Sequence, residues 1–374
     1  MEKSTYKIIR IGDIVQTVSL THKFDKDKLI AINTSDVYNG IMGDGTLTPV
    51  DELKGQFKKT IQKGDILFSE IRPANRRFAK VTVSDCTDFV VSTKLMVLRK
   101  FNNEVDSDYF YYCLTNQPFL ETLQRRAENR IGSFPQITFD LLSNYAFPIP
   151  PLEEQKDIAS IIANIDRKIE LNKQINDNLE AQLRLITSRY IFSCPNLEKK
   201  RIGEIATVKA GGDCPITFSK TRTRKCNIPI FSNGTEDRGL YGFTNKAKIE
   251  GHSITVAARG TIGYCERRLM PFVPIIRLLA ITPKEDGAYI YLHQVIRGMK
   301  FNKNGSVQQQ LTIPEISFIE IPYPHSGILH EYNNVASPIV EMIERNISEN
   351  EILTKQRDEL LPLLMNGQAS VNSD

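Results

Sequence analysis

The sequence lacks most of the residue patterns that would give it catalytic chemistry of its own. It has no tryptophan, and its six cysteines are scattered, with no Cys-x-x-Cys pair and no Cys/His group at zinc spacing. No P-loop is present, and no glycine-rich loop links a strand to a helix as a cofactor site requires. The Asp/Asn-Pro-Pro-Tyr/Phe tetrapeptide typical of amino-methyltransferases is also missing. We therefore expect no catalytic residue, cofactor or metal ion in this chain.

Long apolar runs are absent as well. No segment reaches the roughly 18 uninterrupted apolar residues of a membrane span, and the nearest candidate, residues 271–281, is interrupted by Arg277. Residues 1–4 are not followed by the apolar stretch of a signal peptide. Scattered cysteines are typical of reduced thiols. These absences predict a cytoplasmic protein without membrane contact.

What the sequence does contain is internal repetition. Three segments recur in the same order: Ile9–Ile14 as Lys200–Ile205, Gln136–Thr138 as Gln310–Thr312, and Phe147–Pro150 as Ile321–Pro324. Repeats this far apart indicate duplicated domains rather than the short units of a solenoid. Two similar surfaces suit a long ligand such as duplex DNA.

A long amphipathic stretch follows each proline-containing repeat. The first predicts a helix from Leu152 to about Ile186, which would extend roughly 50 Å at ~1.5 Å per residue. The second predicts a helix that begins near Pro338, is kinked or ended by Pro362, and is capped by Gly367. Because each stripe is wide and needs a partner, we expect the two helices to pair antiparallel as a coiled coil.

Two asparagines occupy matching places in these stripes, Asn172 and Asn350. A polar residue at a buried seam position can fix register and partner choice. The alternative is that each asparagine is partly exposed and has no such role.

The predicted fold class is therefore α+β, with two similar mixed α/β domains separated by two long antiparallel coiled-coil helices. Short β-branched runs such as Phe89–Thr93 indicate strands within the first domain. The expected division is residues 1–150 for the first domain, 151–189 for the first helix, 190–326 for the second domain, and 327–374 for the second helix and tail.

The net charge of +4 is small, but its distribution along the chain is uneven. Lys and Arg exceed Asp and Glu in residues 190–326, whereas the acidic residues dominate in 327–374. A basic domain favours a polyanionic ligand, and an acidic helix would be repelled by one. The alternative is an ordinary excess for a domain of this size.

Clusters of Arg and Lys beside Asn and Gln supply the candidate DNA contacts. Arg and Asn or Gln side chains can read guanine and adenine in the major groove, and Lys mostly holds phosphate. The candidates are Arg72, Asn75, Arg76, Arg77, Arg222, Arg224, Lys225, Arg259, Arg267, Arg268, Lys303, Gln308, Gln309 and Gln310. For each residue taken alone, the alternative is a solvated surface side chain.

Two further motifs carry a family resemblance. Ile149–Ile158 (IPPLEEQKDI) opens the first helix, and Arg357–Gly367 (RDELLPLLMNG) closes the second. At these two places the chain resembles a specificity subunit of a type I restriction–modification system. The segment Pro324–Leu329, which precedes the second helix, departs from the Pro-Leu-Glu-Glu-Gln pattern.

The resemblance implies a non-catalytic subunit whose two target recognition domains each read one half of a split, asymmetric DNA sequence. It implies docking to two adenine-methylating modification subunits and, in the full complex, to motor-nuclease restriction subunits. S-adenosylmethionine, ATP and magnesium would bind those partners.

Three other functions stay open at this point. The chain could act with methyltransferase partners alone. It could be a solitary nuclease that uses Glu52 and Lys54, although no Pro-Asp precedes them as in nuclease motifs. It could also be a coiled-coil scaffold, which steeply salt-dependent DNA binding would exclude.

Overall fold

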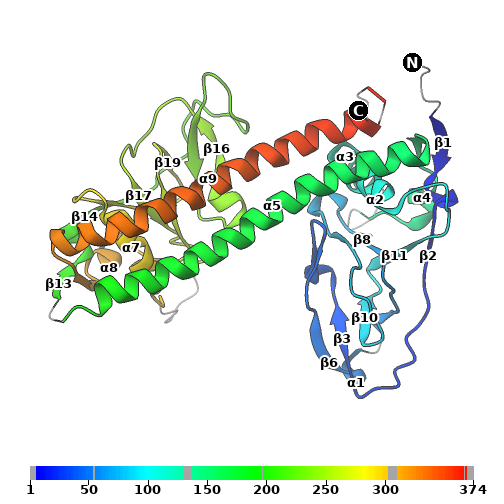
Figure 1. Ribbon diagram of the computed structural model, residues 1–374, viewed down its shortest axis with the longest axis horizontal. Coiled ribbons are helices and arrows are strands. Elements are labelled where there is room, and N and C mark those ends of the chain that lie inside the picture. The colour runs from blue at the N-terminus through cyan, green and yellow to red at the C-terminus, as the bar shows by residue number, and fades with distance from the viewer. Residues whose placement is uncertain are drawn as a thin grey trace. The chain divides into compact units, whose positions relative to one another are not determined.

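The computed structural model of the chain divides into two compact units (Figure 1). Unit 1 comprises Met1–Leu171 with Glu349–Asp374, and unit 2 comprises Asn172–Ser348. The structure describes residues 6–53, 55–129, 136–195, 197–301, 310–365 and 367–368. Because the unit boundaries fall within the two long helices, each unit contains part of both. No helix in the described part of the chain combines the length and apolar composition needed to cross a membrane.

Unit 1 contains two four-stranded sheets. The sheet β2-β11-β8-β9 is antiparallel throughout, whereas β6-β3-β10-β7 contains one parallel pair, β3 with β10. A β1-β12 pair and a β4-β5 hairpin complete its β structure. The strands are β1 (Lys7–Arg10), β2 (Val15–Thr17), β3 (Lys28–Ile32), β4 (Val37–Tyr38), β5 (Ile41–Met42), β6 (Thr46–Pro49), β7 (Phe57–Lys59), β8 (Ile66–Ser69), β9 (Phe78–Lys80), β10 (Phe89–Ser92), β11 (Leu95–Lys100) and β12 (Ala146–Ile149).

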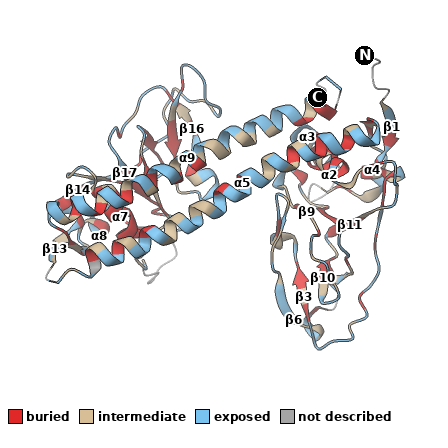
Figure 2. Ribbon diagram, in the orientation of Figure 1, coloured by how far each residue is buried: buried red, intermediate tan, exposed pale blue. Residues whose placement is uncertain are grey.

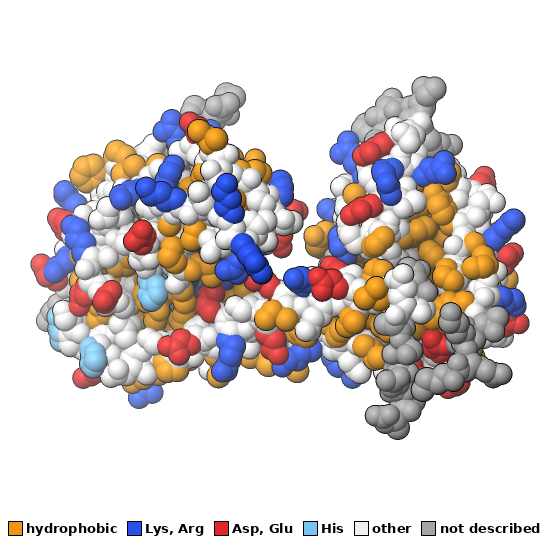
Figure 3. Space-filling view, turned by 90° about the horizontal axis from the view of Figure 1, so that it is seen from above, with side chains coloured by type: hydrophobic (Ala, Val, Ile, Leu, Met, Phe, Trp, Pro, Cys, Tyr) orange, Lys and Arg blue, Asp and Glu red, His pale blue; other side chains and the backbone are white. Residues whose placement is uncertain are grey.

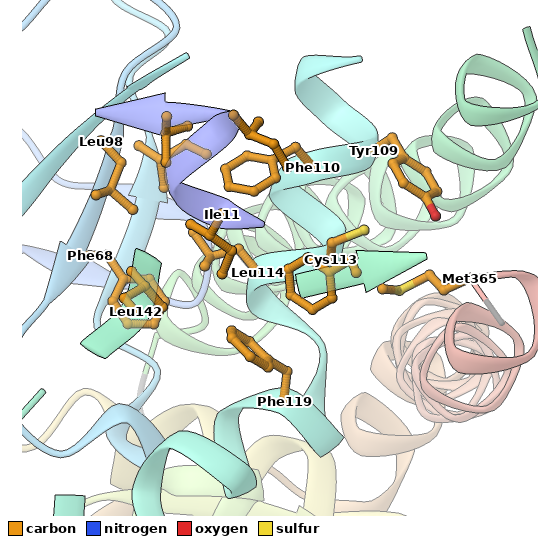
Figure 4. Close-up of a cluster of buried hydrophobic side chains, with 14 of the residues drawn as sticks. Ile11, Phe68, Leu98, Tyr109, Phe110, Cys113, Leu114, Phe119, Leu142 and Met365 are labelled. Carbon is orange, nitrogen blue, oxygen red and sulfur yellow. The ribbon is translucent and has the colours of Figure 1, made fainter. Parts of the chain in front are cut away.

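Short helices pack against these sheets. The helices are α1 (Val50–Leu53), α2 (Ser107–Thr115), α3 (Gln117–Glu128) and α4 (Phe139–Ser143), with 3-10 turns η1 (Ile11–Asp13), η2 (Thr34–Asp36) and η3 (Pro73–Asn75). Asp106 caps α2, because its side chain accepts from the backbone N–H groups of Asp108 and Tyr109 in the first turn of that helix. The main core brings together Ile11, Phe68 from β8, Phe110 from α2 and Leu142 from α4 (Figure 4).

Unit 2 repeats this plan. Its strands are β13 (Glu198–Arg201), β14 (Ala206–Ala210), β15 (Ile228–Phe231), β16 (Leu240–Thr244), β17 (Ser253–Val256), β18 (Cys265–Arg268), β19 (Val273–Pro274), β20 (Leu279–Pro283) and β21 (Glu320–Tyr323). Its short helices are α6 (Ile202–Ile205), α7 (Ala288–Arg297) and α8 (Ile313–Ser317), with the 3-10 segment η5 (Glu236–Gly239). The sheets have the orders β14-β20-β17-β18, β16-β15-β19 and β13-β21.

The strand orders confirm that the sequence repeats encode one duplicated topology. The antiparallel sheet β14-β20-β17-β18 corresponds to β2-β11-β8-β9, and β13-β21 corresponds to β1-β12. The repeated glycine has the same packing in both copies. A Cβ added at Gly12 would lie 3.1 Å from the Cβ of Ser143, and one at Gly203 would lie 3.1 Å from the Cβ of Ser317. Glycine therefore permits the close approach of α4 or α8.

The first long helix, α5, runs from Leu152 to Thr187 and continues as a π-helical segment, Ser188–Phe192. Its start is fixed by Gln155, which is buried in unit 1. The Gln155 side chain donates to the carbonyl oxygens of Pro150 (2.8 Å) and Glu104 (3.0 Å) and accepts from the backbone N–H of Asp106 (2.7 Å). The glutamine of the helix-opening motif thus joins α5 to the capping residue of α2.

The second long helix, α9, runs from Ser326 to Met365, so the predicted start near Pro338 is wrong. Pro338 lies inside the helix, where it removes one backbone N–H donor. The neighbouring Ala336 and Val340 are buried in the core of unit 2 and keep the chain helical there. Pro362 does not end the helix either, because Leu364 and Met365 continue it into the core of unit 1. Gly367, with φ +66°, follows the helix as predicted.

Contacts within each unit show that α5 and α9 are antiparallel. Residue numbers rise along one helix as they fall along the other. The contacts are Asp166 with Arg357 (2.9 Å) and the Ile169 carbonyl with Asn350 (3.2 Å) in unit 1, and Asn176 with Asn346 (2.8 Å) and Thr187 with Tyr332 (2.9 Å) in unit 2. Buried residues recur along both helices (Figure 2). The predicted class, with two similar mixed units and two long antiparallel helices, is confirmed.

The two stripe asparagines have different environments. Asn172 is buried, whereas Asn350 is half-buried and donates to the backbone of α5. A polar contact of this kind is satisfied in one register of the helix pair and lost in a shifted one. The four-segment division made from the sequence stays a prediction.

We predict that Gln155→Ala lowers the free energy of unfolding by about 2 to 3 kcal/mol, because it removes three hydrogen bonds and leaves the half-buried Asp106 N–H without its acceptor. Urea unfolding followed by circular dichroism measures the change. Gln182→Ala is the control, since Gln182 is exposed on the same helix. Equal stability of the two variants would contradict the role given to Gln155.

Candidate nucleic-acid interface

The candidate loop of unit 1 connects β8 to β9 and contains η3. Arg72 and Arg76 flank η3 with positive φ angles of 46° and 55°, a conformation that costs non-glycine residues free energy. The loop is tied to α3, where Gln124 Oε1 accepts from the Ala74 N–H at 3.2 Å. Arg72 and Asn75 are exposed. Across the described residues, neither side chain has a hydrogen-bond or ion-pair partner, so both can reach a ligand.

Arg76 and Arg77 are half-buried and donate within unit 1 instead. The contacts are Arg76 Nε to Asn39 Oδ1 (2.9 Å), Arg76 Nη1 to Gln117 Oε1 (3.1 Å), and Arg77 Nη1 to the carbonyl oxygens of Ser35 (3.1 Å) and Val37 (3.3 Å). Arg77 also lies over the Tyr38 ring, 5.4 Å from its centroid. These two arginines hold the β4-β5 hairpin beside the loop and leave few donors for DNA.

The basic cluster of unit 2 lies on a tight turn before β15. The Thr223 N–H donates to the Cys226 carbonyl at 2.9 Å, and the Cys226 N–H donates to Thr223 Oγ1, also at 2.9 Å. Arg222, Arg224 and Lys225 are all exposed on this turn. In the described ranges no partner is found for their side chains. Figure 3 shows several Lys and Arg side chains on the visible face of unit 2.

Arg259 and Gln310 are brought together. Arg259 lies on the loop between β17 and β18, and its Nε and Nη2 donate to Gln310 Oε1 at 3.1 and 2.6 Å. In unit 1 the repeated glutamine, Gln136, donates to Glu70 Oε2 of the corresponding loop at 2.8 Å. The recurring glutamine therefore contacts the loop after β8 in one unit and after β17 in the other. The remaining candidates, Lys303, Gln308 and Gln309, lie outside the described residues.

The predicted DNA contacts Arg267 and Arg268 do not lie at the surface. Both side chains are buried, at 4% exposure, and cannot reach a ligand there. Arg267 pairs with Glu180 of α5 and donates to Nδ1 of His293 on α7 at 3.0 Å. Arg268 donates to Thr255 Oγ1 at 3.0 Å. Adjacent strand residues point to opposite faces of a sheet. Both faces of β18 are covered here, so neither arginine reaches solvent.

A second arginine connects this region to α9. Arg238 donates to Glu266 (2.8 Å) and, through two nitrogens, to Glu344 of α9 (2.9 and 3.0 Å). Burial alone would raise the pKa of Glu266, but Arg238 and the Tyr264 hydroxyl together hold that pKa below its usual value. Burial and the nearby Arg238 lower the pKa of Arg268 to about 10. Acidic residues of both long helices thus neutralise the buried Arg267 and the half-buried Arg238 of unit 2.

Comparison with known proteins decides the family. The family described as "Type I restriction modification DNA specificity domain" matches residues 3–181 and again residues 196–361. The chain belongs to this family. The specificity subunit of the Haemophilus influenzae type I restriction enzyme HindI is 28% identical over 458 residues, covering 98% of this chain and 100% of that protein. The MjaIX specificity subunit of Methanocaldococcus jannaschii is 23% identical, covering 71% of this chain and 70% of that protein.

One solved structure of a type I restriction–modification S subunit shares the fold of this chain. The type I restriction–modification S subunit from M. genitalium has a TM-score of 0.56 at 16% identity, covering 98% of this chain and 97% of that one. The two family matches correspond to the two repeated halves of the sequence. The family resemblance inferred from the helix-opening and helix-closing motifs is therefore confirmed.

Sequence reasoning on this specificity-family chain missed an aromatic group beside the basic turn of unit 2. Phe218 and Tyr241 are exposed, with ring centroids 5.6 Å apart, and Lys220 lies 4.7 Å from the Tyr241 centroid. Neither ring is basic or carries an amide, the two features that marked the predicted DNA contacts. The signal was present as Phe218 and Lys220 two residues apart, just before Arg222. Within the described ranges, no His, Cys, Asp and Glu side chains are grouped as a metal site.

We predict that stability falls at acidic pH partly through His293. Burial and the adjacent Arg267 hold the pKa of His293 well below its usual value, so the folded protein keeps the ring neutral. The unfolded chain binds this proton below a pH of about 6.5, and the free energy of unfolding then drops by up to about 1.4 kcal/mol per pH unit. His293→Asn retains an acceptor for Arg267 and does not titrate.

Urea unfolding at pH 7.5 and pH 5 measures both proteins. The His293→Asn variant should lose less stability between these pH values than the unmodified protein does. His252→Asn, at an exposed position, should leave the pH dependence unchanged. Identical pH dependence in the His293→Asn variant and the unmodified protein would refute this account of the buried ring.

Proposed function

We propose that this chain is the non-catalytic DNA-recognition subunit of a type I restriction–modification complex in the cytoplasm. Unit 1 binds one half of a bipartite, asymmetric target and unit 2 binds the other. The chain docks two adenine-methylating modification subunits and, in the full complex, restriction subunits. S-adenosylmethionine, ATP and magnesium are bound by those partners.

One observation carries this proposal. Both halves of the chain match the DNA specificity domain family, and each half has a loop with an exposed arginine after the equivalent strand of its sheet. Arg72 follows β8 in unit 1, and Arg259 follows β17 in unit 2. Both side chains are exposed. Arginine at such loops can donate two hydrogen bonds to the O6 and N7 atoms of guanine.

Other candidates divide by chemistry. Asn75, exposed beside Arg72, can make paired hydrogen bonds to adenine. Arg222, Arg224 and Lys225 form a dense positive surface that suits phosphates. Both long helices contribute residues to each reading unit, because the unit boundaries fall within them.

We predict that Arg72→Ala and Arg259→Ala each weaken binding to the target duplex by about 1 to 3 kcal/mol. The target is first obtained by sequencing methylated adenines in cells that carry the chain with its modification partner. Fluorescence anisotropy with the chain and modification subunits assembled then measures the affinity at several salt concentrations.

Lys63→Ala is the matched control, because Lys63 is exposed in the turn before β8, whereas Arg72 follows that strand. It should change affinity little. Unchanged affinity in both arginine variants would remove these residues from the interface. Binding of the unmodified assembly that does not depend on salt would contradict DNA recognition itself, since phosphate contacts release counterions.

A further inference from the structure

An apolar surface with a positive rim stands out on unit 2. We define the methyl-contact patch as Ile216, Phe218 and Tyr241 with Lys220, Lys246 and Lys248. All six side chains are exposed, and Ile216 is fully so. Burying an isoleucine side chain away from water is favourable, and the fold of unit 2 does not bury Ile216. Figure 3 shows apolar side chains among Lys and Arg on the visible face of unit 2.

The patch is built rigidly. The chain at Ser219 pairs with Phe243 of β16 through two backbone hydrogen bonds of 2.9 and 2.8 Å, and Thr244 Oγ1 donates to the Thr217 carbonyl at 2.7 Å. Gly242 leaves room for the Phe218 ring, because a Cβ there would lie 2.5 Å from that ring. These contacts fix the segment that carries Ile216 and Phe218 before any ligand arrives, which reduces the entropy lost on binding.

The charges around the patch select its ligand. Lys220 lies over the Tyr241 ring, and Lys246 and Lys248 line a shallow cavity of about 420 Å³ beside Ile216. The basic turn with Arg222 and Arg224 is only a few residues away along the chain. A ligand that fits must combine negative charge with small apolar groups at its surface. Duplex DNA does so, since its phosphates flank a major groove in which thymine displays a 5-methyl group.

We propose that Ile216 contacts thymine 5-methyl groups in the half-site bound by unit 2. Phe218 and Tyr241 supply further apolar surface on the same segment and on β16, and the lysines hold the flanking phosphates. This inference rests on the proposed function and adds apolar readout to the hydrogen-bonding readout by arginine. It makes Ile216 a residue that determines specificity.

Unit 1 has a comparable combination at another place in its fold. Tyr38 and Ile41 are exposed opposite each other in the β4-β5 hairpin, and Arg77 lies over the Tyr38 ring. The exposed Arg72 belongs to the loop that this hairpin contacts through Arg76. Exposed apolar side chains therefore accompany cationic loops in both units, which fits one kind of ligand.

Replacing thymine by uracil removes the 5-methyl group and leaves base pairing intact. With the assembled chain and modification subunits, affinities are measured for target duplexes in which each thymine is replaced in turn by deoxyuridine. Removing a contacted methyl group should weaken binding about fourfold, because burying one such carbon contributes ~0.8 kcal/mol and each 1.4 kcal/mol changes the dissociation constant about tenfold. The effect should be confined to one half-site. Ile216→Ala should bind the unmodified target more weakly and lose its response to uracil at the same position.

Leu185→Ala is the control, because Leu185 is exposed on α5 in unit 2 but outside the methyl-contact patch. It should keep the full response to uracil. Equal binding of thymine and uracil duplexes by the unmodified assembly would overturn the inference while leaving DNA recognition intact. So would an Ile216→Ala variant that keeps the full uracil response. If Ile216→Ala loses binding to the modification subunits but still binds uracil-containing duplexes more weakly than the thymine duplex, the patch is a protein-docking surface and the inference is overturned. Absence of any target binding would refute the proposed function.

Discussion

Both hydrophobic cores depend on the same pair of long helices. In unit 1 the core includes Ile158 and Ile162 from α5 together with Leu361, Leu364 and Met365 from α9. Figure 4 shows Met365 beside Cys113 and other core side chains of that unit. In unit 2 it includes Leu183 from α5 and Leu329, Tyr332, Ala336 and Val340 from α9. Neither core is complete without both helices, so a shift of the helix register would expose apolar surface in both units at once. This constraint explains why the helix ends carry the most recognisable motifs of the sequence.

The same helices determine which arginines remain available for DNA. Glu180 of α5 and Glu344 of α9 face unit 2 and pair with Arg267 and Arg238. A buried charge without a partner destabilises a protein by several kcal/mol, so these pairs have to form within the fold. The arginines on the turn before β15 and on the loop after β17 have no such partner on the helices among the described residues and keep their side chains exposed. These acidic residues of the helices therefore stabilise unit 2 by pairing with its arginines.

Much of this organisation could be predicted from the sequence, because periodicity and repetition are long-range signals. The first amphipathic stretch predicted α5, and the repeated segments predicted duplicated domains. The structure adds that Gly12 and Gly203 pack in the same way in the two copies. Pro338 misled the prediction, since tertiary packing outweighs the lost hydrogen bond. Arg267 and Arg268 could not be told from surface arginines, because burial depends on neighbours distant in sequence. Phe218 and Tyr241 come together through the pairing of two segments that no local pattern reveals.

The central claim is that α5 and α9 pair antiparallel in the register that places Asn176 against Asn346, whose side chains are 2.8 Å apart. Replacing both asparagines by cysteine and oxidising the protein tests this directly, with peptide mass spectrometry to identify the bond. The account predicts one intramolecular disulfide between these positions and a higher unfolding midpoint than in the reduced protein, as expected when a crosslink restricts the unfolded chain. Failure to form that bond, or a disulfide that joins two separate molecules instead, would contradict the helix register on which both units depend.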